Sequence, residues 1–315
     1  MKICLYTFTG TGNTKICGDF IKKYLEDMGD SVDHYVFNSA DTTHPNPNDY
    51  DMIGIGYPIH AFNIPEVFSD FLKELEPVNN KKYFIYKVSG EPFHLNDCSS
   101  YHSAKRLKKK GYNLFLEKHF IMPYNIMFNY NFSLKKQMYL YLEALTKVFA
   151  MKIHNEEEEL IRYTFGKKIF SSILRIEWIA PKLNSTFVRV DKKKCINCNL
   201  CINNCPTKAI YRNDKNEIRI NSHCAMCMRC TLNCPTDAIK YGFMNSWKVN
   251  GRFNYNKLVN DDSISGDYVN ANTKGYFKLF KKYFAEQNKE LEEYKIDIPV
   301  EYKEEDDLSK YLKNK

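Results

Sequence analysis

Short apolar runs alternate with amphipathic helical patterns over residues 1–125. Five runs are rich in residues that favour strands, and they span residues 2–8, 31–37, 51–56, 82–89 and 114–122. Between them, apolar residues recur at helical spacing after residue 14 and over residues 65–75 and 99–110. Strands that alternate with helices in this way predict an α/β fold with a doubly wound parallel sheet.

Three further segments follow the predicted sheet. Helical spacing of apolar residues predicts helices over residues 133–161 and 169–179. A late helical face is formed by Tyr276, Phe280, Tyr283, Phe284, Leu291 and Tyr294. That face would either pack on its own chain or dock onto a redox partner or a membrane surface. We expect a sheet domain, a helical connector, a small α+β domain and a partly helical extension, at residues 1–130, 131–186, 187–243 and 244–315.

Eight of the eleven cysteines fall in two copies of one pattern, C-x2-C-x2-C-x3-C-P. The first copy ends at Pro206 and the second at Pro235, and the cysteines are Cys195, Cys198, Cys201, Cys205, Cys224, Cys227, Cys230 and Cys234. The segments that follow also match, TKAI in one case and TDAI in the other, so the region is an internal repeat. Both copies resemble the spacing with which bacterial-type ferredoxins hold two [4Fe–4S] clusters.

In such ferredoxins the three close cysteines of a run bind one cluster, and the fourth binds the other cluster. The resemblance implies one cluster on Cys195, Cys198, Cys201 and Cys234, and another on Cys224, Cys227, Cys230 and Cys205. Zinc sites pair two C-x2-C units across a longer gap, and a disulfide framework needs an oxidising compartment. The spacing therefore favours iron–sulfur clusters over both alternatives.

A turn rich in glycine and threonine joins the first predicted strand to the first predicted helix, and it consists of Thr9, Gly10, Thr11, Gly12, Asn13 and Thr14. Such a turn offers backbone N–H groups to an anion at a helix N-terminus. It lacks the Gly-Lys-Ser/Thr of a P-loop, and Lys15 replaces the third glycine of a dinucleotide motif. It resembles the phosphate loop of flavodoxins, which implies that it binds FMN. The alternative is a turn with no ligand.

Two further loops follow the third and fourth predicted strands. In a flavodoxin-like sheet these loops lie beside the phosphate loop. The resemblance implies flavin contacts from Tyr57, Pro58, Ile59, His60, Ala61, Phe62 and Asn63, and from Ser89, Gly90, Glu91 and Phe93. The loop after the fourth strand departs from the acidic, aromatic-bearing loop of typical flavodoxins. Either Phe62 or Phe93 could therefore stack on the flavin.

The formal net charge of +8 becomes smaller once the expected cofactors are bound. Eight thiolates remove about eight charges, two oxidised clusters return about four, and an FMN phosphate removes nearly two more. The basic excess thus offsets bound anions, and we expect no nucleic-acid partner. The chain opens without a signal-peptide pattern, and no stretch reaches the ~20 apolar residues of a membrane span. We therefore expect a cytoplasmic protein without a membrane span.

The whole chain resembles flavodoxin–ferredoxin fusion proteins of strict anaerobes, and the likeness is best over residues 1–125 and 187–243. The resemblance implies intracellular electron transfer, in which two [4Fe–4S] clusters and FMN relay electrons for redox partner proteins. The alternative is an FMN-dependent reductase of a quinone, nitro compound or enone, fed by the clusters. A third reading is a docking or sensor protein that uses its clusters structurally. The donor, the acceptor and the oligomeric state stay open.

Overall fold

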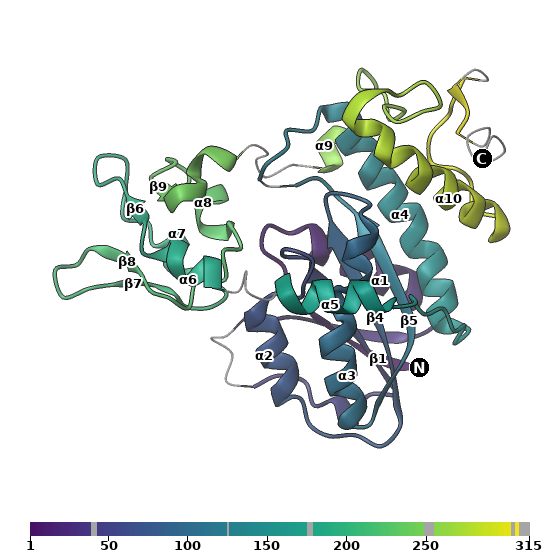
Figure 1. Ribbon diagram of the computed structural model, residues 1–315, viewed down its shortest axis with the longest axis horizontal. Coiled ribbons are helices and arrows are strands. Elements are labelled where there is room, and N and C mark those ends of the chain that lie inside the picture. Colours follow the sequence, from purple (N-terminus) through teal and green to yellow (C-terminus); the bar gives the residue numbers. More distant parts are fainter. Residues whose placement is uncertain (39–42, 125, 175–178, 249–254, 304–305, 309–315) are drawn as a thin grey trace.

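A computed structural model describes residues 1–38, 43–124, 126–174, 179–248, 255–303 and 306–308. Figure 1 shows a larger body built around β1–β5, which we call the sheet unit, and a smaller body beside it. The smaller body, residues 188–247, carries both cysteine runs, and we call it the cysteine unit. Chain ends and the late helix α10 belong to the side of the sheet unit that faces away from the cysteine unit.

Five parallel strands form the central sheet, in the order β2-β1-β3-β4-β5. Their bounds are β1 (Lys2–Thr7), β2 (Ser31–Val36), β3 (Met52–Pro58), β4 (Lys81–Ser89) and β5 (Tyr112–Ile121). This is the doubly wound, flavodoxin-like order, so the predicted fold class is confirmed. The inner strands are buried on both faces, which explains why they read as nearly unbroken apolar runs.

Helices cover both faces of the sheet. One core cluster lies under α1 (Asn13–Asp27) and α4 (Phe132–His154), and the other lies under α2 (Glu66–Glu74) and α3 (Tyr101–Lys109). Short 3-10 turns complete the sheet unit at η1 (Pro47–Asp49) and η2 (His94–Ser100). The helix α1 begins directly at the carboxyl end of β1, which brings its N-terminus to the edge of the sheet where the predicted flavin loops lie.

The helix α4 ends at His154, seven residues before the predicted end, because the acidic residues that follow take another path. Glu156 adopts a left-handed backbone conformation, with φ of 56°. The chain then runs beside β5, where the Glu117 N–H donates to the Glu159 carbonyl at 3.0 Å. The predicted helix over residues 133–161 is therefore correct in type but too long.

The late helix α10 (Leu279–Glu293) packs on its own chain. Phe280, Phe284 and Leu291 are fully buried in the same core cluster as α4, and the rings of Tyr141 and Phe284 lie 4.6 Å apart. Glu290 of α10 also pairs with Lys152 of α4 at 2.8 Å and with Lys118 of β5. The apolar face of the extension thus covers α4, together with α9 (Tyr255–Val259) and the 3-10 turn η5 (Gly275–Lys278).

Two short helices lie between α4 and the cysteine unit. They are α5 (Phe165–Leu174), which lies against η2 of the sheet unit, and α6 (Ile179–Ser185), which lies against η4 (Gly242–Trp247) of the cysteine unit. The predicted helix over residues 169–179 therefore begins earlier, at Phe165, and its residues 175–178 lie outside the described part.

The cysteine unit is built from two matching halves. Two antiparallel ribbons pair β6 (Val188–Val190) with β9 (Ile239–Tyr241), and β7 (Ile210–Arg212) with β8 (Ile218–Ile220). One-turn helices α7 (Leu200–Asn203) and α8 (Arg229–Leu232) follow equivalent cysteines. Left-handed residues recur at equivalent places, which are Asn197 and Met226, Asn199 and Met228, and Lys208 and Asp237. The repeat seen in the sequence is thus a repeat of backbone conformation.

Candidate functional site: a cavity between the sheet unit and the cysteine unit

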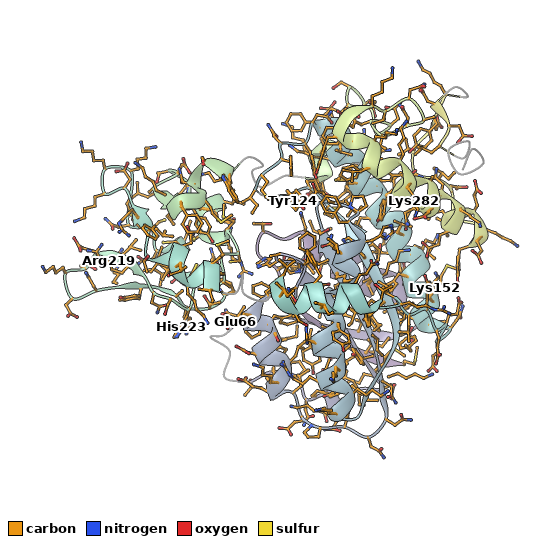
Figure 2. All side chains as sticks on the ribbon, viewed as in Figure 1. Glu66, Tyr124, Lys152, Arg219, His223 and Lys282 are labelled. Atoms are coloured by element: carbon orange, nitrogen blue, oxygen red, sulfur yellow. The ribbon has the colours of Figure 1, made fainter. Side chains whose placement is uncertain are left out.

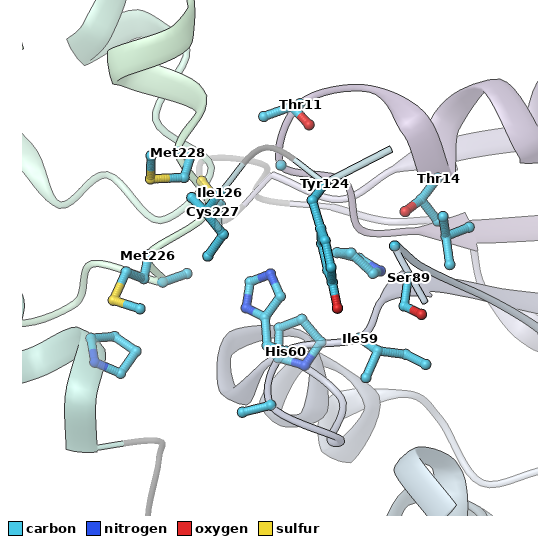
Figure 3. A pocket seen from close by; sticks show the side chains of 18 of the residues that line it. Thr11, Thr14, Ile59, His60, Ser89, Tyr124, Ile126, Met226, Cys227 and Met228 are labelled. Carbon is cyan, nitrogen blue, oxygen red and sulfur yellow. The ribbon is translucent and has the colours of Figure 1, made fainter. Parts of the chain in front are cut away.

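A cavity of about 860 Å³ lies at the carboxyl ends of the inner strands, within the size range of small-molecule and cofactor sites. The sheet unit forms one wall and the cysteine unit forms the other (Figure 3). Most of the predicted flavin residues line this cavity, namely Thr9, Gly10, Thr11, Asn13, Thr14, Pro58, Ile59, His60, Ala61, Phe62, Ser89, Gly90, Glu91 and Phe93. The structure therefore brings together loops that are far apart in the sequence.

The turn at residues 9–14 has the form of an anion site. Gly12 precedes α1 with φ of 113°, a conformation that favours glycine, and its N–H donates to Thr9 Oγ1 at 3.1 Å. Within the described residues, no side chain caps the N-terminus of α1. The N–H groups of the first helical turn are thus available to a ligand, and the helix dipole favours a negative one. These features fit a phosphate group.

The loop after β3 is a tight two-residue turn. Its central residues Ala61 and Phe62 both have positive φ, and His60 and Asn63 exchange two backbone hydrogen bonds of 2.9 Å. The turn directs the His60 ring into the cavity (Figure 3). Burial lowers the pKa of His60 to about 4, so the imidazole is neutral near pH 7. A neutral ring can donate one hydrogen bond and accept another.

Three predicted flavin residues do not line the cavity. Gly12 serves the turn through its backbone, as described above. The Tyr57 side chain is fully buried, and its hydroxyl lies 3.2 Å from Ser99 Oγ. The Asn63 side chain is also buried and donates to the Ser171 carbonyl at 3.2 Å. Tyr57 and Asn63 thus hold the loop after β3 on the sheet unit.

Tyr124 is a lining residue that the sequence reading missed. It follows β5, its ring projects into the cavity (Figure 3), and its hydroxyl donates to Glu91 Oε2 at 2.7 Å. The ring lies so close to Gly90 that a Cβ there would be 2.4 Å from Tyr124 Cγ. Burial raises the pKa of the Glu91 carboxyl, although its bond to Tyr124 opposes the shift. The signal available in the sequence was its position after a strand, because parallel strands end at one edge.

The two aromatic candidates for the flavin also line the cavity. Phe62 packs edge-on against Phe170 of α5, with ring centroids 5.8 Å apart, whereas Phe93 stays 38 % exposed. Tyr124 is a third aromatic ring of this wall, and it stacks on Phe128, which stacks in turn on Tyr276 of the extension. The extension therefore also reaches the cavity, through Tyr276.

The first four-cysteine set surrounds a small cavity of its own. Cys195, Cys198 and Cys201 line it together with Cys234, which comes from the other run. This is the crossed combination that a two-cluster ferredoxin requires, so the residues fit one cubane. Elsewhere in the cysteine unit, Cys205, Cys224 and Cys227 lie close enough to Cys230 to help raise the pKa of its thiol, after burial. They fit a second cubane.

Burial has a chemical consequence for the second set. It raises the pKa of the Cys227 thiol to about 12, so the thiol stays protonated at neutral pH unless a metal replaces the proton. Within the described residues, no three His, Cys, Asp or Glu side chains are placed to hold a single metal ion. Cys224 and Cys227 both line the large cavity as well.

A side chain of the cysteine unit holds the two units together at the phosphate turn. Arg229 Nε donates to the Gly10 carbonyl at 3.0 Å, and another nitrogen of the same guanidinium donates to the Thr9 carbonyl. The backbone of Cys227 approaches so closely that a Cβ on Gly10 would lie 2.4 Å from the Cys227 oxygen. Nothing in the local sequence around Arg229 predicts this contact.

The family model of the 4Fe–4S dicluster domain matches residues 194–239, which contain all eight cysteines of the repeat. The chain joins a flavodoxin-like domain to a 4Fe–4S dicluster domain. The first is the sheet unit, by its strand order, and the second is the cysteine unit. The match assigns 4Fe–4S clusters to the dicluster domain, and such clusters serve redox electron transfer.

Comparison with curated proteins gives no match for this chain. Among solved structures, it is similar to Flavodoxin 2 from Bacillus cereus, with 18 % identity, coverage of 50 % of this chain and 99 % of the other, and a TM-score of 0.37. It is also similar to the flavodoxin of Megasphaera elsdenii, with 21 % identity, coverage of 38 % and 85 %, and a TM-score of 0.33. None of the described helices is both long and apolar enough to cross a membrane.

Proposed function

We propose that this protein is an electron carrier in which two [4Fe–4S] clusters and one FMN exchange electrons on behalf of redox partner proteins. The first cluster is held by Cys195, Cys198, Cys201 and Cys234, and the second by Cys224, Cys227, Cys230 and Cys205. The observation that carries the proposal is the shared cavity, because the flavin loops and two cysteines of the second run line the same space.

The residues of the flavodoxin-like domain have distinct tasks in this proposal. The turn at residues 9–14 binds the phosphate through backbone N–H groups. His60 and the pair of Tyr124 and Glu91 face the cavity and can orient the ring system through hydrogen bonds. When bound, FMN supplies the exchange of electrons either singly or in pairs, which lets it trade with centres that carry one electron each.

The proposal is tested on protein purified without oxygen. Iron, sulfide and FMN are counted per chain, and the protein is then titrated with dithionite under optical and EPR observation. We expect about eight irons, about eight sulfides and one FMN, with all three centres reducible. A colourless preparation, or zinc in place of iron, contradicts the proposal. Clusters that are present but do not accept electrons favour a structural role instead.

One feature of the cavity favours the second candidate, a small-molecule reductase. Its far end is apolar and is lined by Ile126, Met127, Phe128, Met226, Met244 and Trp247. An apolar chamber beside a flavin suits a quinone, nitro compound or enone. We keep the carrier as the proposal because the same volume also has to hold the flavin. Rapid turnover of such a compound by the reduced protein, with saturation, would favour the reductase.

A further inference from the structure

The two cysteine runs differ at the positions between their cysteines. When Cys195 is aligned with Cys224, the pairs are Ile196 with Ala225, Asn197 with Met226, Asn199 with Met228, and Leu200 with Arg229. The backbone is left-handed at both members of the second and third pairs. Because both runs have the same backbone and the same ligand spacing, the differences reflect what each run faces and not how it binds a cluster.

The second run faces the flavodoxin-like domain. Ala225, Met226 and Met228 line the large cavity, whereas its described lining includes no residue of the first run from Cys195 to Cys205. Ile196 and Leu200 of the first run are 62 % and 42 % exposed instead. Figure 3 shows Met226, Cys227 and Met228 on the wall opposite Tyr124 and Ser89.

Arg229 is the residue that joins the second run to the phosphate turn. Its guanidinium donates to the carbonyls of Thr9 and Gly10 in one domain and to the carbonyl of Asn204 at 3.1 Å in the other. The planar fork of arginine can serve three acceptors at fixed angles, which a lysine cannot do. Leu200, at the equivalent position, can make no such bonds.

We propose that the second cluster is the one that exchanges electrons with the flavin, that the first cluster faces the redox partner, and that Arg229 is a positioning residue for the exchange. This inference rests on the proposed function. One electron at a time leaves the reduced second cluster, which returns to its oxidised state, and enters the flavin. The first cluster then resupplies the second with an electron from the partner. Two such transfers, with protons from solvent, complete the reduction of the flavin.

The test uses the complete protein, loaded with clusters and saturated with FMN. A pulse of methyl viologen radical, a one-electron donor, reduces the protein, and the flavin absorbance reports the arrival of electrons. In Arg229→Leu, which places the residue of the first run in the second, we expect this rate to fall about tenfold or more because reacting centres are displaced. Arg229→Lys should show a smaller loss. The matched control is Leu200→Ala, which should keep the wild-type rate.

A structural loss alone would not produce this pattern. Iron content, FMN content at saturation and the reduction potentials of Arg229→Leu should equal those of the wild type, so only the exchange rate changes. If Arg229→Leu loses a cofactor, Arg229→Lys carries the test. A wild-type rate in both Arg229 variants, or a loss only in Leu200→Ala, overturns the inference. A wild type that binds no FMN or no clusters overturns the proposed function itself.

Discussion

Gly10 lies where the two domains touch, and any side chain there would meet the backbone of Cys227. In Gly10→Ala the new Cβ would be 2.4 Å from the Cys227 oxygen, so either the turn or the cysteine run must move. We expect the dissociation constant for FMN to rise about tenfold, which corresponds to ~1.4 kcal/mol. Titration of FMN into deflavinated protein, followed by quenching of flavin fluorescence, measures this constant.

The matched control is Gly166→Ala in α5, where a new Cβ meets no atom within 4 Å. This variant should bind FMN as the wild type does. Equal affinities in all three proteins would show that the contact at Gly10 yields without cost, and that the phosphate turn does not depend on the dicluster domain.

His119 supports the loop after β4 and predicts a pH dependence of stability. Its Nε2 lies 2.7 Å from Ser89 Oγ, and burial lowers its pKa to about 3, with smaller effects from Lys87 and His94. The folded pKa lies below the unfolded value, so the unfolded chain alone takes up a proton as the pH falls below about 6.5. Stability is therefore fully present above that pH and falls below it, by up to about 1.4 kcal/mol per pH unit.

The measurement compares thermal unfolding of the wild type with that of His119→Gln, without oxygen, at about pH 7 and about pH 5.5. Glutamine can still donate to Ser89 but does not titrate. We expect the midpoint of the wild type to drop further between the two pH values than that of the variant. Parallel drops in both proteins would mean that His119 is protonated in the folded state.

At this scale the sequence predicted residues whose role is local. The turn at residues 9–14 carries its own signal, since glycine and hydroxyl residues follow a strand and precede a helix. The cysteine spacing does the same for cluster ligands. Tyr124 and Arg229 could not be assigned, because their roles depend on which backbone lies opposite them after folding.

Among the elements, β4 and β5 are joined by a buried ion pair below the flavin loops. Lys87 Nζ lies 2.7 Å from Glu117 Oε1, and both side chains are fully buried. Glu117 also accepts hydrogen bonds from Ser100 of η2 and from Tyr163, the latter at 2.7 Å. The pair therefore ties the sheet to the segment that leads into α5.

Removal of one partner should destabilise the fold strongly. Lys87→Met leaves the Glu117 carboxylate buried without its cation, which costs about 3–5 kcal/mol. For a domain of this size the melting midpoint should fall by roughly 10 °C. The double variant Lys87→Met/Glu117→Gln removes both charges, keeps the bonds to Ser100 and Tyr163, and should recover most of the loss. Anaerobic melting followed by circular dichroism decides; equal midpoints for both variants would refute the assigned cost.

The strands could be predicted nearly to the residue, since their apolar runs are set by burial on both faces. The end of α4 could not, because Glu157 and Glu159 leave the helix for contacts with Tyr294 and β5 that only the tertiary fold provides. The late helical face was visible in the sequence, but its partner was not: it covers α4, more than a hundred residues earlier in the chain.

For the whole molecule, the outer end of the dicluster domain is basic and lies far from the cavity. Lys193 and Lys194 are exposed beside Cys195, and Arg219 marks the outermost part of this end (Figure 2). Exposed Ile196 and Leu200 lie between the cysteines of the first run. A basic rim around exposed apolar residues suits an acidic partner, since charge complementarity steers association.

An acidic bacterial-type ferredoxin, reduced beforehand, serves as the probe for this face. Because steering is electrostatic, its second-order rate of electron donation should fall steeply as salt increases. In Lys193→Glu/Lys194→Glu the rate at low salt should drop about tenfold, and the difference from the wild type should vanish at high salt. The matched control, Lys278→Glu/Lys282→Glu, makes the same charge change on the extension, where Figure 2 shows Lys282 on the side away from the dicluster domain. A loss of equal size in the control would indicate an effect of net charge alone, and an unchanged rate in the first variant would mean that electrons enter elsewhere.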